Sequence, residues 1–196
     1  LLESPTLAED DAHLVKIVRR HGQRLNETVD NVLQLSRRRQ PQISRIALKQ
    51  WLEEFAQEFQ QQPLHRRVGL SLRVAPDDIQ ADLDPSHLYQ ILSNLCANAV
   101  RHSGRGEQTF IALEATLDAR GRPFLEISDN GKGIPDEVAA RLFEPFHSTA
   151  AEGTGLGLYL CRELCESNRA RLTLVAARSA RFRLSFAGPE QGDTHA

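Results

Sequence analysis

Two asparagines in the stretch NLCANAVRH have the residue type and spacing of a metal site. Asn94 and Asn98 are four residues apart, so on a helix they share one face. Amide oxygens suit hard cations, and Mg²⁺ in proteins binds a few protein groups together with substrate phosphates. Arg101 and His102 extend the face by one turn, where they could meet those phosphates. Taken alone, the motif also fits an exposed helix face without a ligand.

The stretch ISDNGKGIP places a carboxylate where a predicted strand ends. Strand alternation puts Asp129 on the core side, and a buried carboxylate without a partner is costly. A group that only accepts hydrogen bonds suits an amine donor, such as the exocyclic amine of adenine. Gly131 and Gly133 would let the backbone close around a flat ring. The alternative is an ordinary turn at Asn130-Gly131.

The glycine cluster GTGLG, residues 153–157, leads directly into a helical pattern over 158–168. Backbone N–H groups at a helix N-terminus favour a phosphate. The cluster is no Walker loop, because Leu158-Tyr159 stands where that loop needs Lys and Ser or Thr. Its spacing also differs from the dinucleotide fingerprint. Glycines of a tight turn without a ligand are the alternative.

Two phenylalanines, Phe143 and Phe146, bracket Glu144-Pro145 between the aspartate motif and the glycine cluster. Aromatic residues near a turn are usually core, so this motif gains meaning only from its position. The segment 147–152 has the length and polarity of a mobile lid. The order of the four motifs within about sixty residues is very improbable by chance.

In this order the motifs resemble the N, G1, F and G2 boxes of sensor histidine kinases, which match NLCANAVRH, DNGKGI, LFEPF and GTGLGL. The resemblance covers essentially the whole chain and is strongest to the nitrogen-regulation group and its type IV pilus sensor kinases. It implies an α+β fold, a two-layer α/β sandwich that binds ATP, with Asn98 as the Mg²⁺ ligand, Asn94 as a second candidate, and Asp129 on adenine. The implied ATP-binding residues are Asn94, Asn98, Arg101, His102, Asp129, Gly131, Gly133, Ile134, Phe143, Phe146, Thr149, Gly153, Thr154, Gly155, Leu156 and Gly157.

The chain departs from the family pattern in three places. Arg101 and His102 stand where the family often has Lys followed by Tyr or His, so a positive group is kept. Ala150 stands where related kinases often carry a lid lysine. The phosphoacceptor box is absent, since neither His13 nor His21 is followed by its acidic residue and proline. We therefore expect no catalytic residue in this chain and an acceptor histidine upstream of Leu1.

The four motifs lie in a catalytic domain that we expect over residues 41–188. A helical module at 1–40 precedes this domain, and a loose tail at 189–196 follows it. The helical pattern carries an apolar heptad seam from Leu14 to Leu35, widened by Ile17, Val29 and Leu33. A seam this wide predicts a homodimer through the helix at 7–39, packed as a four-helix bundle.

Beyond Pro41 the pattern alternates between strands and helices. The predicted strands are 43–48, 68–74, 79–83, 109–117, 124–129, 171–176 and 181–186. The predicted helices are 51–59, 85–102, 135–142 and 158–168. Asp84-Pro85, an N-cap followed by proline at the first helical position, predicts the start of the second. This order predicts an antiparallel-leaning sheet with interspersed helices.

Composition excludes several classes of protein. The 196 residues are 40% hydrophobic and carry a net charge of −2, which gives no global field for nucleic acid. No apolar run approaches the roughly 18 residues of a membrane helix. Cys96, Cys161 and Cys165 lie in helical patterns without zinc spacing, so we expect reduced core residues. The absence of Met and the start at Leu1-Leu2 predict a fragment. The resemblance to sensor kinases implies that it is the cytoplasmic portion of a parent anchored in the bacterial inner membrane.

The resemblance implies transfer of the ATP γ-phosphoryl group to a histidine and then to an aspartate of a response regulator receiver domain. Two alternatives remain. A related ATPase would need a glutamate one turn before the metal asparagine, and Asn94 there cannot take a proton. A nucleotide-binding dimerisation module without transfer should have lost motif residues, and all of them are present.

Overall fold

The computed structural model describes residues 14–15, 17–19, 21–22, 25, 29, 40–62, 68–102, 108–147 and 154–187. The described residues before 40 are helical, as the heptad pattern predicts, and four of its apolar side chains are exposed: Leu14, Val18, Leu25 and Val29. Most of the predicted dimerisation helix lies outside the described residues, so the homodimer stays a prediction.

In the described part of the chain, five strands form the main sheet in the order β2-β4-β5-β7-β6. These strands are β2 (Gly69–Val74), β4 (Phe110–Leu117), β5 (Pro123–Asp129), β6 (Arg171–Ala176) and β7 (Arg181–Ser185). Strand β2 runs parallel to β4, and the other neighbours are antiparallel. A separate antiparallel pair joins β1 (Ser44–Ala47) to β3 (Gln80–Leu83). The predicted antiparallel-leaning sheet is therefore confirmed.

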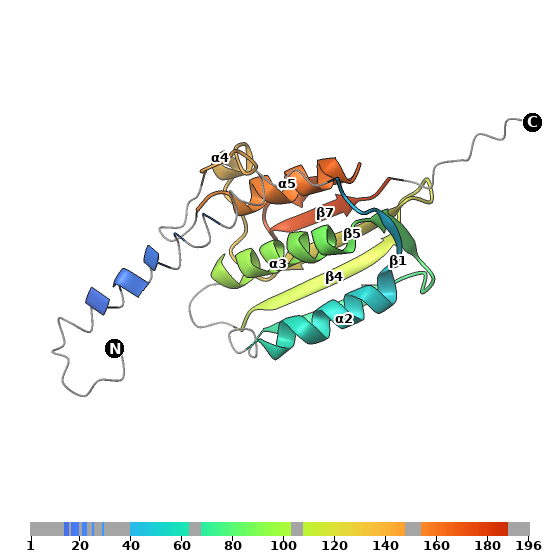
Figure 1. The fold of residues 1–196 in the computed structure, drawn as a ribbon, viewed down its shortest axis with the longest axis horizontal. Helices are drawn as coiled ribbons and strands as arrows, with labels where there is room; N and C mark the ends of the chain where they lie inside the picture. The colour runs from blue at the N-terminus through green and yellow to red at the C-terminus, as the bar shows by residue number, and fades with distance from the viewer. Residues whose placement is uncertain are drawn as a thin grey trace, which may run out of the picture.

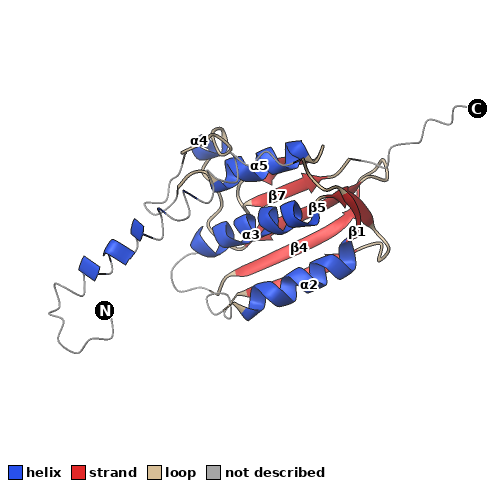
Figure 2. Ribbon diagram, in the orientation of Figure 1, coloured by secondary structure: helices blue, strands red, loops and turns tan. Residues whose placement is uncertain are grey.

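Three helices cover one face of the main sheet: α2 (Leu48–Gln61), α3 (Pro85–His102) and α5 (Gly157–Ser167) (Figure 1). Strand β4 shows why they lie on that face. Ile111, Leu113 and Ala115 alternate along it and are buried, whereas Glu114 between them is exposed. The helices thus form one layer and the strands the other (Figure 2), which confirms the predicted α+β two-layer sandwich.

Aromatic contacts join α2 to α3 in the core. Trp51 stacks on Phe55 with ring centroids 5.8 Å apart, and Phe55 meets Tyr89 edge to face at 5.6 Å. The three cysteines are free and buried, as predicted, and burial raises the pKa of the Cys96 thiol to about 12. A thiol with such a pKa stays protonated and acts as a small apolar core group.

Helix α3 begins at the predicted cap. The Asp84 carboxylate accepts hydrogen bonds from the backbone N–H of Ser86 at 2.9 Å and from its hydroxyl at 2.6 Å. It also accepts one from the backbone N–H of Gln42 at 2.7 Å, which ties the chain before β1 to α3. Burial alone would raise the pKa of Asp84, but these hydrogen bonds outweigh it and hold the pKa below its usual value.

The structure differs from the predicted elements at two places. Leu48 opens helix α2 instead of closing the first strand, and it is fully buried there. The helix predicted over 135–142 is reduced to α4 (Asp136–Ala139), followed by turns with hydrogen bonds from Arg141 to Val138 and from Glu144 to Arg141. The predicted domain boundaries at 40 and 188 stay predictions.

Candidate functional site

A cavity of about 460 Å³ opens between the C-terminal half of α3, the end of β5, the loop before α4 and the start of α5. Residues from all four sequence motifs line it, the phenylalanine motif through Leu142. The predicted site residues in the lining are Asn94, Asn98, Arg101, His102, Asp129, Gly131, Gly133, Ile134, Thr154, Gly155 and Gly157. These motifs lie up to sixty residues apart in the sequence, so the fold alone brings them to one place.

Asp129 lies at the end of β5 with its carboxylate half-buried in the cavity wall. Its Oδ1 accepts a hydrogen bond from the Gly131 N–H at 2.8 Å. A Cβ at Gly131 would stand 2.7 Å from the same oxygen, so a side chain there would collide with the carboxylate. Burial raises the pKa of Asp129, although the Gly131 hydrogen bond and the charge of His102 oppose the rise.

The C-terminal turn of α3 contributes positive groups close to Asp129. Arg101 and His102 both line the cavity there. Burial lowers the pKa of His102, the neighbouring Arg101 lowers it further, and Asp129 acts in the opposite direction. His102 is therefore mainly neutral at pH 7 in the free protein, and an arriving polyanion would favour its protonated form.

The two asparagines of α3 have different surroundings. The Asn94 side chain lies close enough to the Cys161 thiol on α5 to lower its pKa, although burial raises that pKa by more. Its Oδ1 also lies 3.9 Å from where a Cβ on Gly157 would stand, so Asn94 faces the beginning of α5. Asn98 lines the cavity one turn later. This makes Asn98 the better-placed candidate for a metal and Asn94 a bridge between the two helices.

The first turn of α5 presents its backbone to the cavity. No side chain caps the helix at Leu156, and the Thr154 hydroxyl accepts only a long 3.4 Å hydrogen bond from the Leu156 N–H. Gly155 turns the chain into the helix with φ +69°, and a Cβ there would lie 2.5 Å from the backbone carbon of Phe146. A helix N-terminus without a cap, open to a cavity, favours an anion.

The loop after β5 closes against the hairpin between β6 and β7. The Ile134 N–H donates to the Ala177 carbonyl at 2.7 Å. A Cβ on Gly133 would lie 2.6 Å from the carbonyl oxygens of Ala177 and Arg178, and its φ is +77°. Gly133 is thus required by backbone packing, whatever binds in the cavity.

Three of the predicted ATP-binding residues that the structure describes do not line the cavity: Phe143, Phe146 and Leu156. Phe143 packs edge to face on Phe182 with centroids 6.5 Å apart, and Phe146 is 73% exposed. The Leu156 side chain is buried in the core, so only its backbone could serve a ligand. Thr149 and Gly153 lie outside the described residues. The two phenylalanines therefore support the cavity from outside, whereas Leu142 of the same motif lines it. Phe143 acts through Phe182, and Phe146 acts through its N–H, which donates to the Gly155 carbonyl at 3.1 Å.

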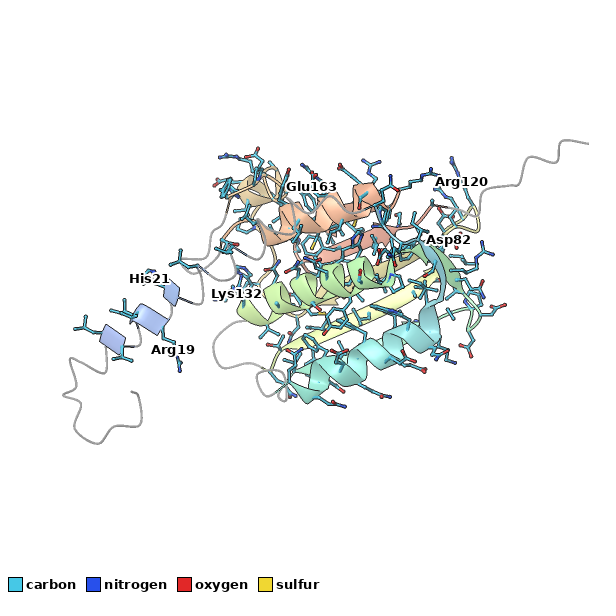
Figure 3. All side chains as sticks on the ribbon, in the orientation of Figure 1. Arg19, His21, Asp82, Arg120, Lys132 and Glu163 are labelled. Atoms are coloured by element: carbon cyan, nitrogen blue, oxygen red, sulfur yellow. The ribbon has the colours of Figure 1, made fainter. Side chains whose placement is uncertain are left out.

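Several cavity residues were missed by sequence reasoning. Lys132 lies between the two predicted glycines and lines the cavity, and Figure 3 shows it beside the end of α3. His147 was predicted only as the first residue of the lid segment 147–152, and it also lines the cavity. Position within a motif could have indicated both. Phe59 from α2 and Phe182 from β7 form apolar wall, and nothing local in their sequence marks them.

The donor set suits a cation carried in with a phosphate ligand better than a resident metal. Among the described residues, no group of three His, Cys, Asp or Glu side chains is placed to hold a metal. The Asn98 amide faces the same cavity as the open start of α5. Mg²⁺ held by one or two protein oxygens and by phosphates fits such a site.

Comparison with known proteins agrees with this geometry. Residues 83–190 match the family described as histidine kinase-, DNA gyrase B-, and HSP90-like ATPase. The sensor protein kinase PilS of Pseudomonas aeruginosa is 42% identical over 97% of this chain, and the chain spans 37% of PilS.

Two solved structures share the fold. The structure of full-length ShkA in complex with AMPPNP has a TM-score of 0.71 and 23% identity, over 95% of this chain and 42% of that one. The structure of the histidine kinase ThkA with the response regulator TrrA has a TM-score of 0.73 and 20% identity, over 94% of this chain and 52% of that one.

In the described residues, no helix is long and apolar enough to cross a membrane.

Proposed function

Because the chain belongs to the histidine kinase-, DNA gyrase B- and HSP90-like ATPase family, we propose that it is the ATP-binding catalytic part of a sensor histidine kinase. The observation that carries this proposal is that Asp129 and the uncapped first turn of α5 line the same cavity. One end offers an acceptor for the amine of adenine, and the other offers N–H groups for phosphates.

In this proposal the position of each residue determines which part of Mg-ATP it contacts. Asp129, fixed by the Gly131 N–H, accepts a hydrogen bond from adenine, and Ile134 and Phe182 give the ring apolar walls. The backbone of 155–157 and the side chains of Arg101 and Lys132 meet the phosphates. Asn98 supplies an amide oxygen to Mg²⁺, which would neutralise phosphate charge during transfer.

The proposed reaction moves the γ-phosphoryl group of ATP to a histidine and then to an aspartate of a receiver domain. Neither His13 nor His21 has the sequence of an acceptor box. We therefore propose that the acceptor is not among these residues, and that the chain alone binds Mg-ATP without labelling itself. Dimerisation through 7–39 and anchoring of a longer protein in the membrane belong to the same proposal. The exposed seam supports the dimer, and the anchoring rests on the family resemblance alone.

Calorimetry with ATP and GTP in Mg²⁺ tests the nucleotide site. The Asp129 carboxylate faces an amine in adenine but a carbonyl oxygen in guanine, so ATP should bind at least about tenfold more tightly. Equal affinity for both nucleotides would contradict the role of Asp129, and no affinity for either would contradict the proposal as a whole.

Transfer is tested with γ-labelled ATP on this chain and on the chain extended at its N-terminus by a histidine-bearing helix. The extended protein should carry an acid-labile phosphohistidine, and this chain should carry none. Binding without label in the extended protein would favour a nucleotide-binding module without transfer. Rapid release of free phosphate by this chain would favour an ATPase, which Asn94 argues against.

A further inference from the structure

The buried side chain of Asn168 joins the end of α5 to the start of α3. It is 1% exposed, and its Oδ1 accepts a hydrogen bond from the Asp84 N–H at 2.9 Å. Its Nδ2 donates to the Leu164 carbonyl at 2.7 Å and lies 2.7 Å from Nδ1 of His87. One amide therefore holds groups of both helices.

Two backbone groups determine which way this amide points. The Asp84 N–H can only donate, so it requires the amide oxygen, and the Leu164 carbonyl can only accept, so it requires the amide nitrogen. The nitrogen consequently donates to Nδ1 of His87, which carries its ring proton on Nε2 when neutral. Turning the amide around would break both backbone hydrogen bonds.

The anchor on the α3 side is itself held firmly. The Asp84 carboxylate accepts from Ser86 and from Gln42, so the peptide that Asn168 contacts is fixed to the first turn of α3 and to the chain before β1. Asp84 is nearly buried, which protects these hydrogen bonds from water.

Helices α3 and α5 run antiparallel and touch along their length (Figure 1). Asn168 and Asp84 meet at one end, the Cys161 thiol lies 3.8 Å from the Ile91 carbonyl in the middle, and Asn94 faces Gly157 at the other end. The last of these pairs lies at the cavity. Over eleven residues α5 extends about 16 Å, so the amide holds the helix at the end remote from the phosphates.

We propose that Asn168 is a positioning residue: it sets the placement of α5 against α3, and so the distance between the open helix start and the amide of Asn98. This inference rests on the proposed nucleotide site. Asp129 lies on β5, whereas the hydrogen bonds of the Asn168 amide go to Asp84, His87, Leu164 and Ser167, which lie on or next to α3 and α5. Loss of the Asn168 hydrogen bonds should therefore weaken phosphate binding and leave recognition of the adenine ring unchanged.

The test compares the affinities of ATP with Mg²⁺ and of adenosine for the wild-type chain, Asn168→Ala and Ser167→Ala. Ser167 stands at the same helix end and is the matched control, because its exposed hydroxyl donates to the Leu164 carbonyl and accepts a 3.3 Å hydrogen bond from the Asn168 amide, and neither bond reaches α3. In Asn168→Ala we expect ATP to bind about 10- to 100-fold more weakly, since misplacement from a remote change can have that size. Adenosine affinity should change less than about twofold, and Ser167→Ala should match wild type.

The outcomes separate this inference from the proposed function. If wild type binds neither ligand, the nucleotide site itself is wrong. If wild type binds ATP and Asn168→Ala keeps the wild-type ratio of ATP to adenosine affinity, only the positioning role is refuted, because general destabilisation lowers both affinities alike. Should Asn168→Ala fail to fold, His87→Leu removes a single hydrogen bond of a half-buried ring. If His87→Leu weakens ATP binding less than expected for Asn168→Ala and leaves adenosine affinity unchanged, the proposal is supported. An unchanged ratio of ATP to adenosine affinity would overturn it.

Discussion

Asp129→Asn should separate nucleotide binding from stability. Asn can keep the 2.8 Å hydrogen bond from Gly131 through its oxygen, but its NH₂ group then points where the second carboxylate oxygen was. A donor would face the donor amine of adenine. A hydrogen bond to a charged group contributes about 1.5–3 kcal/mol. The expected loss of ATP affinity is therefore about 10- to 150-fold.

The same substitution should leave the free energy of unfolding at pH 7 unchanged or raise it. Burial raises the folded-state pKa of Asp129 above its unfolded value, so the folded protein binds the proton more tightly. Stability from this group is greatest below the unfolded pKa, and it falls as pH rises through the folded pKa. Above that pKa the folded protein carries the full cost of the buried charge, and neutral Asn does not carry it.

Calorimetry gives the affinity, and urea unfolding at several pH values gives the stability. Asp118→Asn is the matched control, because Asp118 lies in the hairpin at the opposite end of β5 and its carboxylate serves only Arg120 and Arg122 there. Unchanged ATP affinity in Asp129→Asn would refute the adenine contact. Lost affinity together with a large loss of stability would refute the argument that the carboxylate serves the ligand at the expense of the fold.

Three further substitutions follow from the geometry. Gly157→Ala should fold as stably as wild type, since the added Cβ meets only Asn94, at 3.9 Å. Because phosphate is proposed to approach the backbone of Gly157, the variant should bind ATP at least about tenfold more weakly. Equal affinity in calorimetry would contradict this. Gly155→Ala should lower the free energy of unfolding by at least about 1–2 kcal/mol in urea, because φ is +69° and the Cβ meets backbone at 2.5 Å; wild-type stability would show that this turn is unstrained. Asp84→Ala should cost about 1–2 kcal/mol at pH 7. The folded pKa of Asp84 is lowered, so its contribution is present above the unfolded pKa of about 3.9 and is lost as pH falls through the folded pKa. A difference from wild type that does not shrink in acid would contradict the role of the ionised cap.

The family and the fold class could be predicted from sequence, and both predictions are confirmed. Periodicity located every strand of the sheet within a residue or two, because alternation on a half-buried strand leaves a direct trace in the sequence. The cap at Asp84-Pro85 located α3 for a similar reason, since the hydrogen bonds of a cap are local. The assigned roles of the site residues stay predictions.

What the sequence determined by itself was local: the elements, the four motifs and the type of ligand they suit. Only the tertiary structure decided which of these residues share one cavity, because that depends on packing between segments far apart in the chain. It placed Phe146 outside the cavity and Lys132 in its wall, and it turned Asn94 toward α5. It also brought Asn168 onto Asp84, eighty-four residues away, through a hydrogen bond that no periodicity could indicate. Such a hydrogen bond leaves no pattern in either segment, since the Asn168 amide and the Asp84 N–H meet only when both helices pack on the same sheet.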